Sequence, residues 1–189
     1  MTQADFPLPD DLPVPADDGA AAHLSGMTVP ELELRATNGE MVRLSGLPGP
    51  RTVVYLYPMT GRPGSPLPDG WDRIPGARGC TPEACGFRDH HHELARAGAH
   101  VYGLSSQDSD YQAEAVQRLR LPFPLLSDPG LELAAVLSLP TFDAGTGPLY
   151  KRLTMVIAEG RIEHVFYPIF PPDEHAGEVL GWLAAHPVT

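Results

Sequence analysis

The feature that most constrains the fold is an unbroken run of β-branched, aromatic and aliphatic residues from Thr52 to Tyr57. A strand that is apolar on both sides must be covered on both faces, as the central strands of α/β sheets are. Pro58 ends the run. Ala99 to Leu104 is expected to be the second core strand, and a helical pattern separates the two. The sequence therefore predicts an α/β domain with a central mixed β-sheet and helices on both faces.

Shorter signals complete this expected order of elements. Asn38-Gly39 lies between two alternating runs and predicts an N-terminal β-hairpin, and Glu159-Gly160 marks a second hairpin. Ser109 and Gln112 fit a capping box at a helix start, and Asp128-Pro129 fits the start of the next helix. The expected strands are 31–35, 41–44, 52–57, 99–104, 122–126, 152–158 and 161–167, and the expected helices are 82–97, 109–119, 129–137 and one opened by Pro172-Asp173.

Charge and proline divide the chain at its beginning. Of the formal net charge of −11, residues 1–34 supply −7 and contain no lysine or arginine. We expect residues 1–27 to be an acidic, proline-rich, extended and solvated tail, and residues 28–189 to form the domain. The net negative charge disfavours binding to nucleic acids and to anionic membrane surfaces.

The sequence gives no sign of export or membrane insertion. No apolar run approaches the length of about 18–20 residues that a membrane span needs. The first residues lack the basic and apolar regions of a secretory signal. We therefore expect a cytoplasmic protein, whose thiols stay reduced unless a disulfide is catalytic or sensing.

The two cysteines, Cys80 and Cys85, lie at the expected start of the helix that follows the first central strand. Unpaired N–H groups and the helix dipole make a helix N-terminus electropositive, which lowers a thiol's pKa and favours the reactive thiolate. The simpler alternative is a small, inert buried cysteine. Five helical residues separate two Cα atoms by about 8–9 Å, which is too far for a disulfide. If both cysteines are helical, they can form a disulfide only after the first turn unwinds.

The segment from Gly79 to Asp89, Gly-Cys-Thr-Pro-Glu-Ala-Cys-Gly-Phe-Arg-Asp, together with Tyr57-Pro58, resembles the peroxiredoxins. The similarity is strongest to the bacterioferritin-comigratory-protein or Q-type branch, in which a second cysteine follows the first by five residues. It implies a thioredoxin-like fold and a thiol-dependent peroxidase that reduces hydrogen peroxide and organic hydroperoxides without metal or cofactor. Cys80 would be the peroxidatic nucleophile, Cys85 the resolving thiol, and thioredoxin or a similar dithiol the reductant.

The resemblance also implies an arginine at the start of a later strand, and Arg152 matches it. A fixed guanidinium there would stabilise the Cys80 thiolate and bind the peroxide oxygens. One departure concerns the hydroxyl residue that the family places three residues before the cysteine, because Ala77 stands there. Either Thr60 folds back to supply the hydroxyl, or backbone N–H groups and Arg78 replace it, with Gly79 and Thr81 flanking the sulfur.

Ala77 lies near the end of a long connection, residues 59–79, which holds four prolines and five glycines. Loops of this length in compact domains are usually functional or disordered. Trp71 and Ile74 indicate a structured loop that packs onto the domain, and Trp71 is also a candidate wall of the peroxide pocket.

Two alternatives remain open at this stage. Cys85, Asp89 and His92 share a helix face beside the run His90–His92, but consecutive histidines diverge on a helix, so we expect no functional metal site. The second alternative is a thiol–disulfide exchange or redox-sensing protein on the same fold, although such exchangers use two residues between their cysteines. We expect a monomer or weak homodimer.

Overall fold

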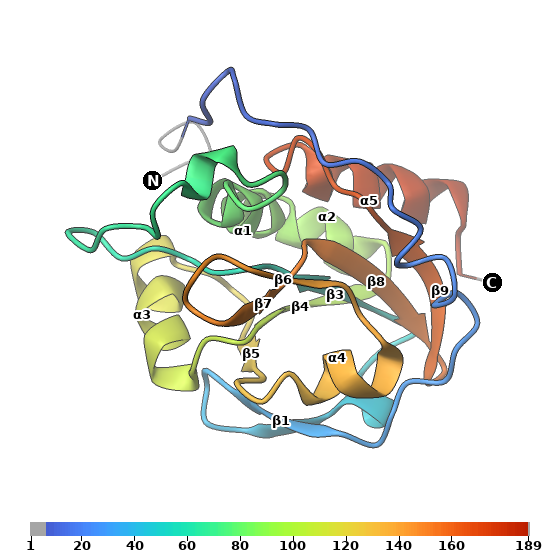
Figure 1. Cartoon of the computed structure of the whole chain (residues 1–189). Coiled ribbons are helices and arrows are strands. Elements are labelled where there is room, and N and C mark those ends of the chain that lie inside the picture. Colours follow the sequence, from blue (N-terminus) through green and yellow to red (C-terminus); the bar gives the residue numbers. More distant parts are fainter. Residues whose placement is uncertain (1–6, 189) are drawn as a thin grey trace.

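The computed structural model describes residues 7–188. A seven-stranded sheet in the order β2-β1-β5-β4-β3-β8-β9 forms its centre, and β6 and β7 make a separate hairpin (Figure 1). The strands are β1 Glu33–Ala36, β2 Met41–Arg43, β3 Arg51–Leu56, β4 Ala99–Ser105, β5 Leu125–Ser127, β6 Thr141–Asp143, β7 Pro148–Tyr150, β8 Leu153–Ala158 and β9 Arg161–Phe166. The helices are α1 Cys80–Asp89, α2 His91–Arg96, α3 Ser109–Leu119, α4 Glu132–Leu137 and α5 His175–Ala185, with short 3-10 turns at Leu44–Gly46 and Trp71–Arg73.

The expected central strand is confirmed as β3. All six of its residues are buried, and it pairs in parallel with β4 and antiparallel with β8. Val53 and Tyr55 belong to one core, whereas Val54 and Leu56 belong to the other, because successive side chains of a strand point to opposite faces. The predicted mixed sheet is therefore correct.

Helices cover both faces of this sheet. The core on one face takes apolar residues from α1, α2, α3 and α5, such as Phe87 and Val179. The core on the other face takes Leu133 and Leu137 from α4. This arrangement confirms the predicted layers and places the N-terminus of α1 at the end of β3, where the 59–79 connection returns to the sheet (Figure 1).

The helix expected over 82–97 differs from the observed structure in two ways. It begins at Cys80, and it is divided into α1 and α2 at His90, whose backbone leaves the helical range at φ −95° and ψ 7°. The first turn starts two residues early because Gly79 adopts a left-handed conformation, φ 110°, that turns the chain directly into the helix.

Capping side chains also differ from the sequence expectation. Asp108, and not Ser109, caps α3, since its carboxylate accepts the N–H of Tyr111. The Ser109 hydroxyl donates to Ala36 instead, and Gln112 is buried. Asp128 does act as a cap, but for a helix that begins at Glu132. The β6–β7 hairpin was not predicted, because its three-residue strands carry no clear alternation.

The N-terminal segment, residues 7–27, runs along the domain in an extended path (Figure 1). Its final part is not solvated as expected, because Ala21 and Leu24 are 8% and 0% exposed and belong to the core on the α4 face. Two pairings fix the middle of the segment, since Asp18 accepts from the Lys151 ammonium and from the Tyr167 hydroxyl, each at 2.7 Å. Packed structure therefore begins before residue 28.

Over the part of the chain that the structure describes, none of the helices has both the length and the apolar character needed to cross a membrane.

Candidate active site

Cys80 is the first residue of α1 and lies where the carboxyl end of β3 meets the 59–79 loop. Gly79 provides no side chain to cap the helix, so the first N–H groups of α1 are left to a ligand or to the cysteine itself. The side chain of Cys80 is only 4% exposed, yet it lines a cleft that opens to the surface. A sulfur in this position is screened from bulk water but reachable from the cleft.

Arg152 binds this sulfur directly. It comes immediately before β8, whose first residue pairs with Leu56 at the end of β3, and this register brings the guanidinium to the start of α1. Its Nη2 donates to Cys80 Sγ at 3.2 Å and to the carbonyls of Ala77 and Arg78 at 3.2 and 3.3 Å. The predicted placement of Arg152 beside Cys80 agrees with these contacts.

Glu83 is a site residue that sequence reasoning missed. It is fully buried one turn after Cys80, and its carboxylate pairs with Nη1 of Arg152. Burial raises the pKa of the Glu83 carboxyl, while Arg152 and His175 act against this shift. The available signal was an acidic residue three positions after the cysteine in the first helical turn, but only the tertiary structure shows that it faces inward.

The burial of Cys80 adds an influence on its pKa that the sequence expectation did not include. Burial raises the pKa of the thiol above its ordinary value, whereas Arg152 lowers it, Glu83 raises it and the Met59 N–H lowers it. The expectation of a depressed pKa considered the helix N-terminus alone and omitted the loss of hydration in the closed site. Stabilisation of the thiolate here depends on Arg152, because the other close charge, Glu83, is negative.

The cleft above Cys80 has a volume of about 480 Å³. Its walls come from the first described residues, from the 59–79 loop and from the first turn of α1. The lining residues are Pro7, Leu8, Met59, Gly61, Arg62, Pro63, Ser65, Leu67, Trp71, Arg78, Gly79, Cys80, Thr81, Pro82 and Arg118. This is the size of a small-molecule site.

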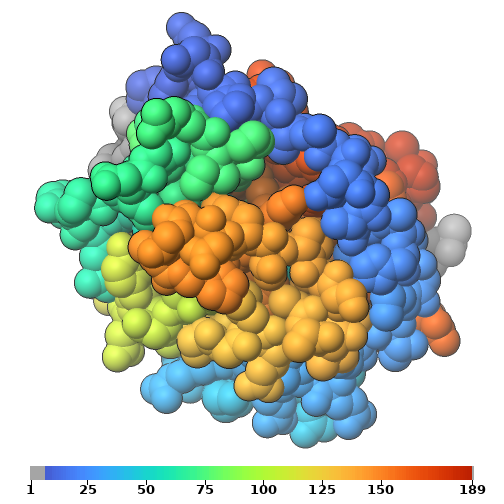
Figure 2. All heavy atoms as spheres, viewed as in Figure 1, coloured from blue at the N-terminus to red at the C-terminus, as the bar shows by residue number. Residues whose placement is uncertain are grey.

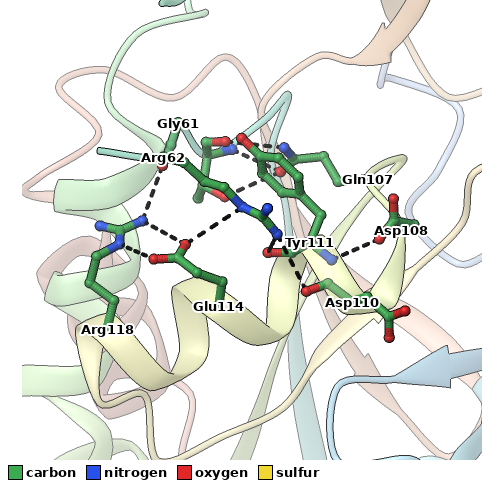
Figure 3. Close-up of polar contacts among 9 residues, drawn as sticks. Gly61, Arg62, Gln107, Asp108, Asp110, Tyr111, Glu114 and Arg118 are labelled. Carbon is green, nitrogen blue, oxygen red and sulfur yellow. Dashed lines mark hydrogen bonds and ion pairs between the residues drawn. The ribbon is translucent and has the colours of Figure 1, made fainter. Parts of the chain in front are cut away.

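The 59–79 loop is a structured loop, as expected. Trp71 is 4% exposed and packs with Ala77 and Leu149, and it also lines the cleft, so both interpretations of this residue agree with its position. The beginning of the loop is attached to α3 (Figure 3): Arg118 donates to the Gly61 carbonyl at 3.0 Å, and the Arg62 guanidinium lies 3.9 Å from the Tyr111 ring centre. These contacts hold one wall of the cleft in place.

The candidate positioning residues fall into two groups. Arg78, Gly79 and Thr81 line the cleft beside Cys80, and the Arg78 carbonyl also accepts from Arg152. The Arg78 side chain itself pairs with Asp72 at 3.1 Å. Thr60 is absent from the cleft lining; it is buried, and its hydroxyl lies 3.2 Å from the Gln107 side-chain oxygen, to which it donates.

Cys85 lies apart from the cleft. It is 0% exposed in the core beneath α1, and both cysteines are free thiols. Burial raises the pKa of its thiol, while the neighbouring Arg88 lowers it. Because both cysteines belong to α1, their Cα atoms are about 8–9 Å apart, and no disulfide can form until the helix unwinds.

The histidine run beside these cysteines forms no ligand cluster in the described structure. Among residues 7–188, no group of three His, Cys, Asp or Glu side chains converges as metal ligands do. His91 instead lies against the Phe123 ring, with a distance of 5.9 Å between ring centres.

Comparisons with known proteins agree with this geometry. The family model described as Redoxin matches residues 24–180. Peroxiredoxin Bcp of Escherichia coli K12 is 32% identical over 166 residues, which cover 86% of this chain and 96% of that protein. The chloroplastic peroxiredoxin Q of Oryza sativa subsp. japonica is 35% identical over 156 residues, or 82% of this chain, and the match spans only 64% of the rice protein.

Comparison with a solved structure leads to the same family. The crystal structure of peroxidoxin BcpB from Mycobacterium tuberculosis superposes with a TM-score of 0.70 at 31% identity, and the match covers 88% of this chain and all of that one. The fold is thioredoxin-like, as the sequence predicts. Because the family model spans most of the chain and the E. coli relative is matched over nearly its whole length, the chain belongs to the peroxiredoxins, in their Q/Bcp-type branch.

Proposed function

We propose that the protein is a thiol-dependent peroxidase that reduces hydrogen peroxide and organic hydroperoxides. The observation that carries this proposal is the guanidinium of Arg152, which lies 3.2 Å from the Sγ of Cys80, a residue that lines an open cleft. A fixed cation in a water-poor site stabilises both a thiolate and the negative charge that develops on peroxide oxygens.

In the first step, the Cys80 thiolate attacks one oxygen of the peroxide. A new S–O bond forms as the O–O bond breaks, and the second oxygen leaves as water or alcohol after it takes up a proton. Cys80 is oxidised to a sulfenic acid while the peroxide is reduced. The guanidinium of Arg152 and the N–H groups at the start of α1, near Gly79 and Thr81, would bind the oxygens during this step.

In the second step, Cys85 attacks the sulfenic sulfur, and water leaves as the disulfide forms. This step needs the first turns of α1 to unwind, because the helix holds the two Cα atoms too far apart. An external dithiol, such as thioredoxin, then returns two electrons and restores both thiols. Since the mechanism uses only cysteine sulfur, it requires no metal and no cofactor.

Stopped-flow mixing of the reduced protein with hydrogen peroxide tests this assignment. We expect Cys80 to react much faster than a free thiol and the Cys80→Ser variant to be inert. Cys85→Ser should keep the fast first oxidation and accumulate a sulfenic acid that mass spectrometry detects as one added oxygen. Turnover with thioredoxin and its reductase should then consume peroxide steadily.

A rate no faster than that of a free cysteine would overturn the proposal. If the protein instead exchanged disulfides rapidly with oxidised dithiols while ignoring peroxide, the thiol–disulfide exchange or redox-sensing alternative would replace it.

We further infer a cytoplasmic protein that works as a monomer or weak homodimer. Two free thiols suit a reducing compartment. Light scattering after size exclusion would measure the mass of the particle, and a stable higher oligomer would contradict this inference.

A further inference from the structure

One wall of the cleft above Cys80 comes from a part of the chain that the family model does not match. Pro7 and Leu8 line the cleft, whereas the Redoxin match begins at residue 24. The N-terminal segment therefore adds surface to the site that the matched part of the domain does not supply.

Leu8 lies against the residue that precedes the reactive cysteine. A Cβ placed on Gly79 would be 3.3 Å from Leu8 Cδ2. Two contacts further along hold the segment in this position: Pro15 lies over Gly76, and Asp18 binds Lys151 and Tyr167. In Figure 2 the N-terminal segment (blue) lies beside the 59–79 loop (green) on the surface.

The 59–79 loop adds further apolar lining. Leu67, Trp71 and Met59, at the start of the loop, line the same cleft as Pro7 and Leu8. The cleft volume of about 480 Å³ is many times the volume of about 30 Å³ that a water molecule occupies in the liquid. Hydrogen peroxide has only two heavy atoms, so the remaining space suits an organic group bonded to the peroxide.

The charges at the cleft favour an uncharged organic group. Three arginines line it, and each has a carboxylate of this chain within 4.0 Å: Arg62 and Arg118 share Glu114, and Arg78 pairs with Asp72. Arg62 also stacks on Tyr111, and both Arg62 and Arg118 donate to backbone carbonyls (Figure 3). Arg62 and Arg118 fasten the loop to α3, Arg78 pairs within the loop, and the two carboxylates offset two of the three positive charges.

We propose that Leu8, together with Leu67 and Trp71, binds the organic group of an uncharged hydroperoxide and that Leu8 determines specificity between bulky and small peroxides. This inference rests on the proposed peroxidase function. The chemistry is unchanged: Cys80 takes the terminal oxygen, the O–O bond breaks, and the alcohol leaves with a proton.

The test compares Leu8→Ser with Val14→Ser, a control on the same segment whose side chain is 67% exposed and does not line the cleft. Stopped-flow rate constants are measured with hydrogen peroxide, with cumene hydroperoxide and with a carboxylate-bearing analogue of cumene hydroperoxide. We expect Leu8→Ser to lower the ratio of the cumene hydroperoxide rate constant to the hydrogen peroxide rate constant about tenfold, the scale of one lost apolar contact in a pocket. Leu67→Ser should lower this ratio in the same direction, and Val14→Ser should change neither rate.

Equal effects of Leu8→Ser on both peroxides, or no effect on either, would overturn the inference. A faster reaction with the carboxylate analogue than with cumene hydroperoxide would show that the arginines attract anions, and it would overturn the assignment to an uncharged group. If the unmodified protein reacted with none of the three peroxides, the proposed function itself would fail, and that result differs from all the others.

Discussion

Arg152 is a single side chain that joins three parts of the site. Its guanidinium binds the Cys80 sulfur, the Glu83 carboxylate, and the carbonyls of Ala77 and Arg78. Glu83 raises the pKa of the thiol electrostatically, yet it also holds the guanidinium in one orientation. Glu83 therefore opposes ionisation of Cys80, but it also fixes the guanidinium of Arg152. A guanidinium held in this way can stabilise the sulfur and the peroxide oxygens without reorganising.

Arg152→Met removes the strongest influence that lowers the pKa of Cys80. We expect the pKa of the thiol to rise further, so the thiolate fraction falls at every pH below it. Oxidation by hydrogen peroxide at neutral pH should slow by about 10²–10³-fold, the usual effect of losing one such donor. The loss should be smaller in alkaline solution, where both proteins are ionised; thiolate absorbance and stopped-flow rates across pH would measure both effects.

Two further variants make this result interpretable. Arg152→Met leaves the Glu83 carboxylate buried without its cation, so the double variant with Glu83→Gln separates lost catalysis from lost folding. Arg43→Met, at an exposed pair with Glu33, should leave the pH profile unchanged. A profile for Arg152→Met identical to that of the unmodified protein would contradict the role assigned to this residue.

The sequence proposed Cys80, Cys85 and Arg152 as site residues because each belongs to a local motif or to a strand end, and the structure places Arg152 against the Cys80 sulfur. The sequence was not sufficient for the ionisation of Cys80, which depends on burial by distant segments, or for Glu83, whose partner lies 69 positions away. Thr60 shows the same limit, since its hydroxyl binds Gln107 on the loop after β4.

At the scale of elements, the start of α1 is held by a close contact with the loop before α5. Gly79 has φ 110°, and a Cβ there would lie 2.3 Å from Cγ of Pro172, which precedes α5. The loop before α5 therefore packs directly onto the turn that positions the reactive sulfur.

Gly79→Ala should consequently destabilise the protein. Both the positive φ and the contact with Pro172 oppose a methyl group, and we expect a loss of about 1–3 kcal/mol in the free energy of unfolding, measured by urea denaturation. Oxidation of Cys80 should also slow as the first turn shifts away from Arg152. The control is Gly177→Ala in α5, where a Cβ meets no atom within 4 Å, and which should be neutral or stabilising. Equal stability of the two variants would refute this explanation.

Long apolar elements such as β3 and β4 were predictable because their pattern reflects burial directly. Element ends were less predictable, since they depend on one capping group: Asp108 instead of Ser109 at α3, and Gly79 instead of Pro82 at α1. The break at His90 and the β6–β7 hairpin follow from backbone geometry that leaves little trace in hydrophobic periodicity.

At the scale of the whole molecule, the N-terminal segment is part of the packed structure and not an appendage. Charge and proline content suggested a solvated tail separate from the domain, but Ala21 and Leu24 of this segment are buried in the core on the α4 face. Ala21 and Leu24 lie in a stretch of prolines, alanines and acids that has no helical or strand periodicity, so no sequence signal indicated their role.

Leu24→Ala measures how strongly this segment supports the fold. Leu24 is fully buried, so we expect its truncation to lower the free energy of unfolding by about 2–5 kcal/mol, as seen for core leucines. Val14→Ala, on the exposed part of the same segment, should stay within about 0.5 kcal/mol. Urea denaturation of both variants would decide the matter, and a Leu24→Ala protein as stable as the parent would show that the segment is dispensable.

The position of Leu8 over Gly79 affects how easily Cys80 is irreversibly oxidised when peroxide is abundant. The turn that Leu8 covers is the one that must open before Cys85 can reach an oxidised Cys80. While the turn stays shut, a second peroxide molecule has time to convert the sulfenic acid to sulfinic acid, which thioredoxin does not repair. A chain clipped by a protease ahead of residue 17 should therefore close its disulfide sooner and survive more turnovers before permanent inactivation.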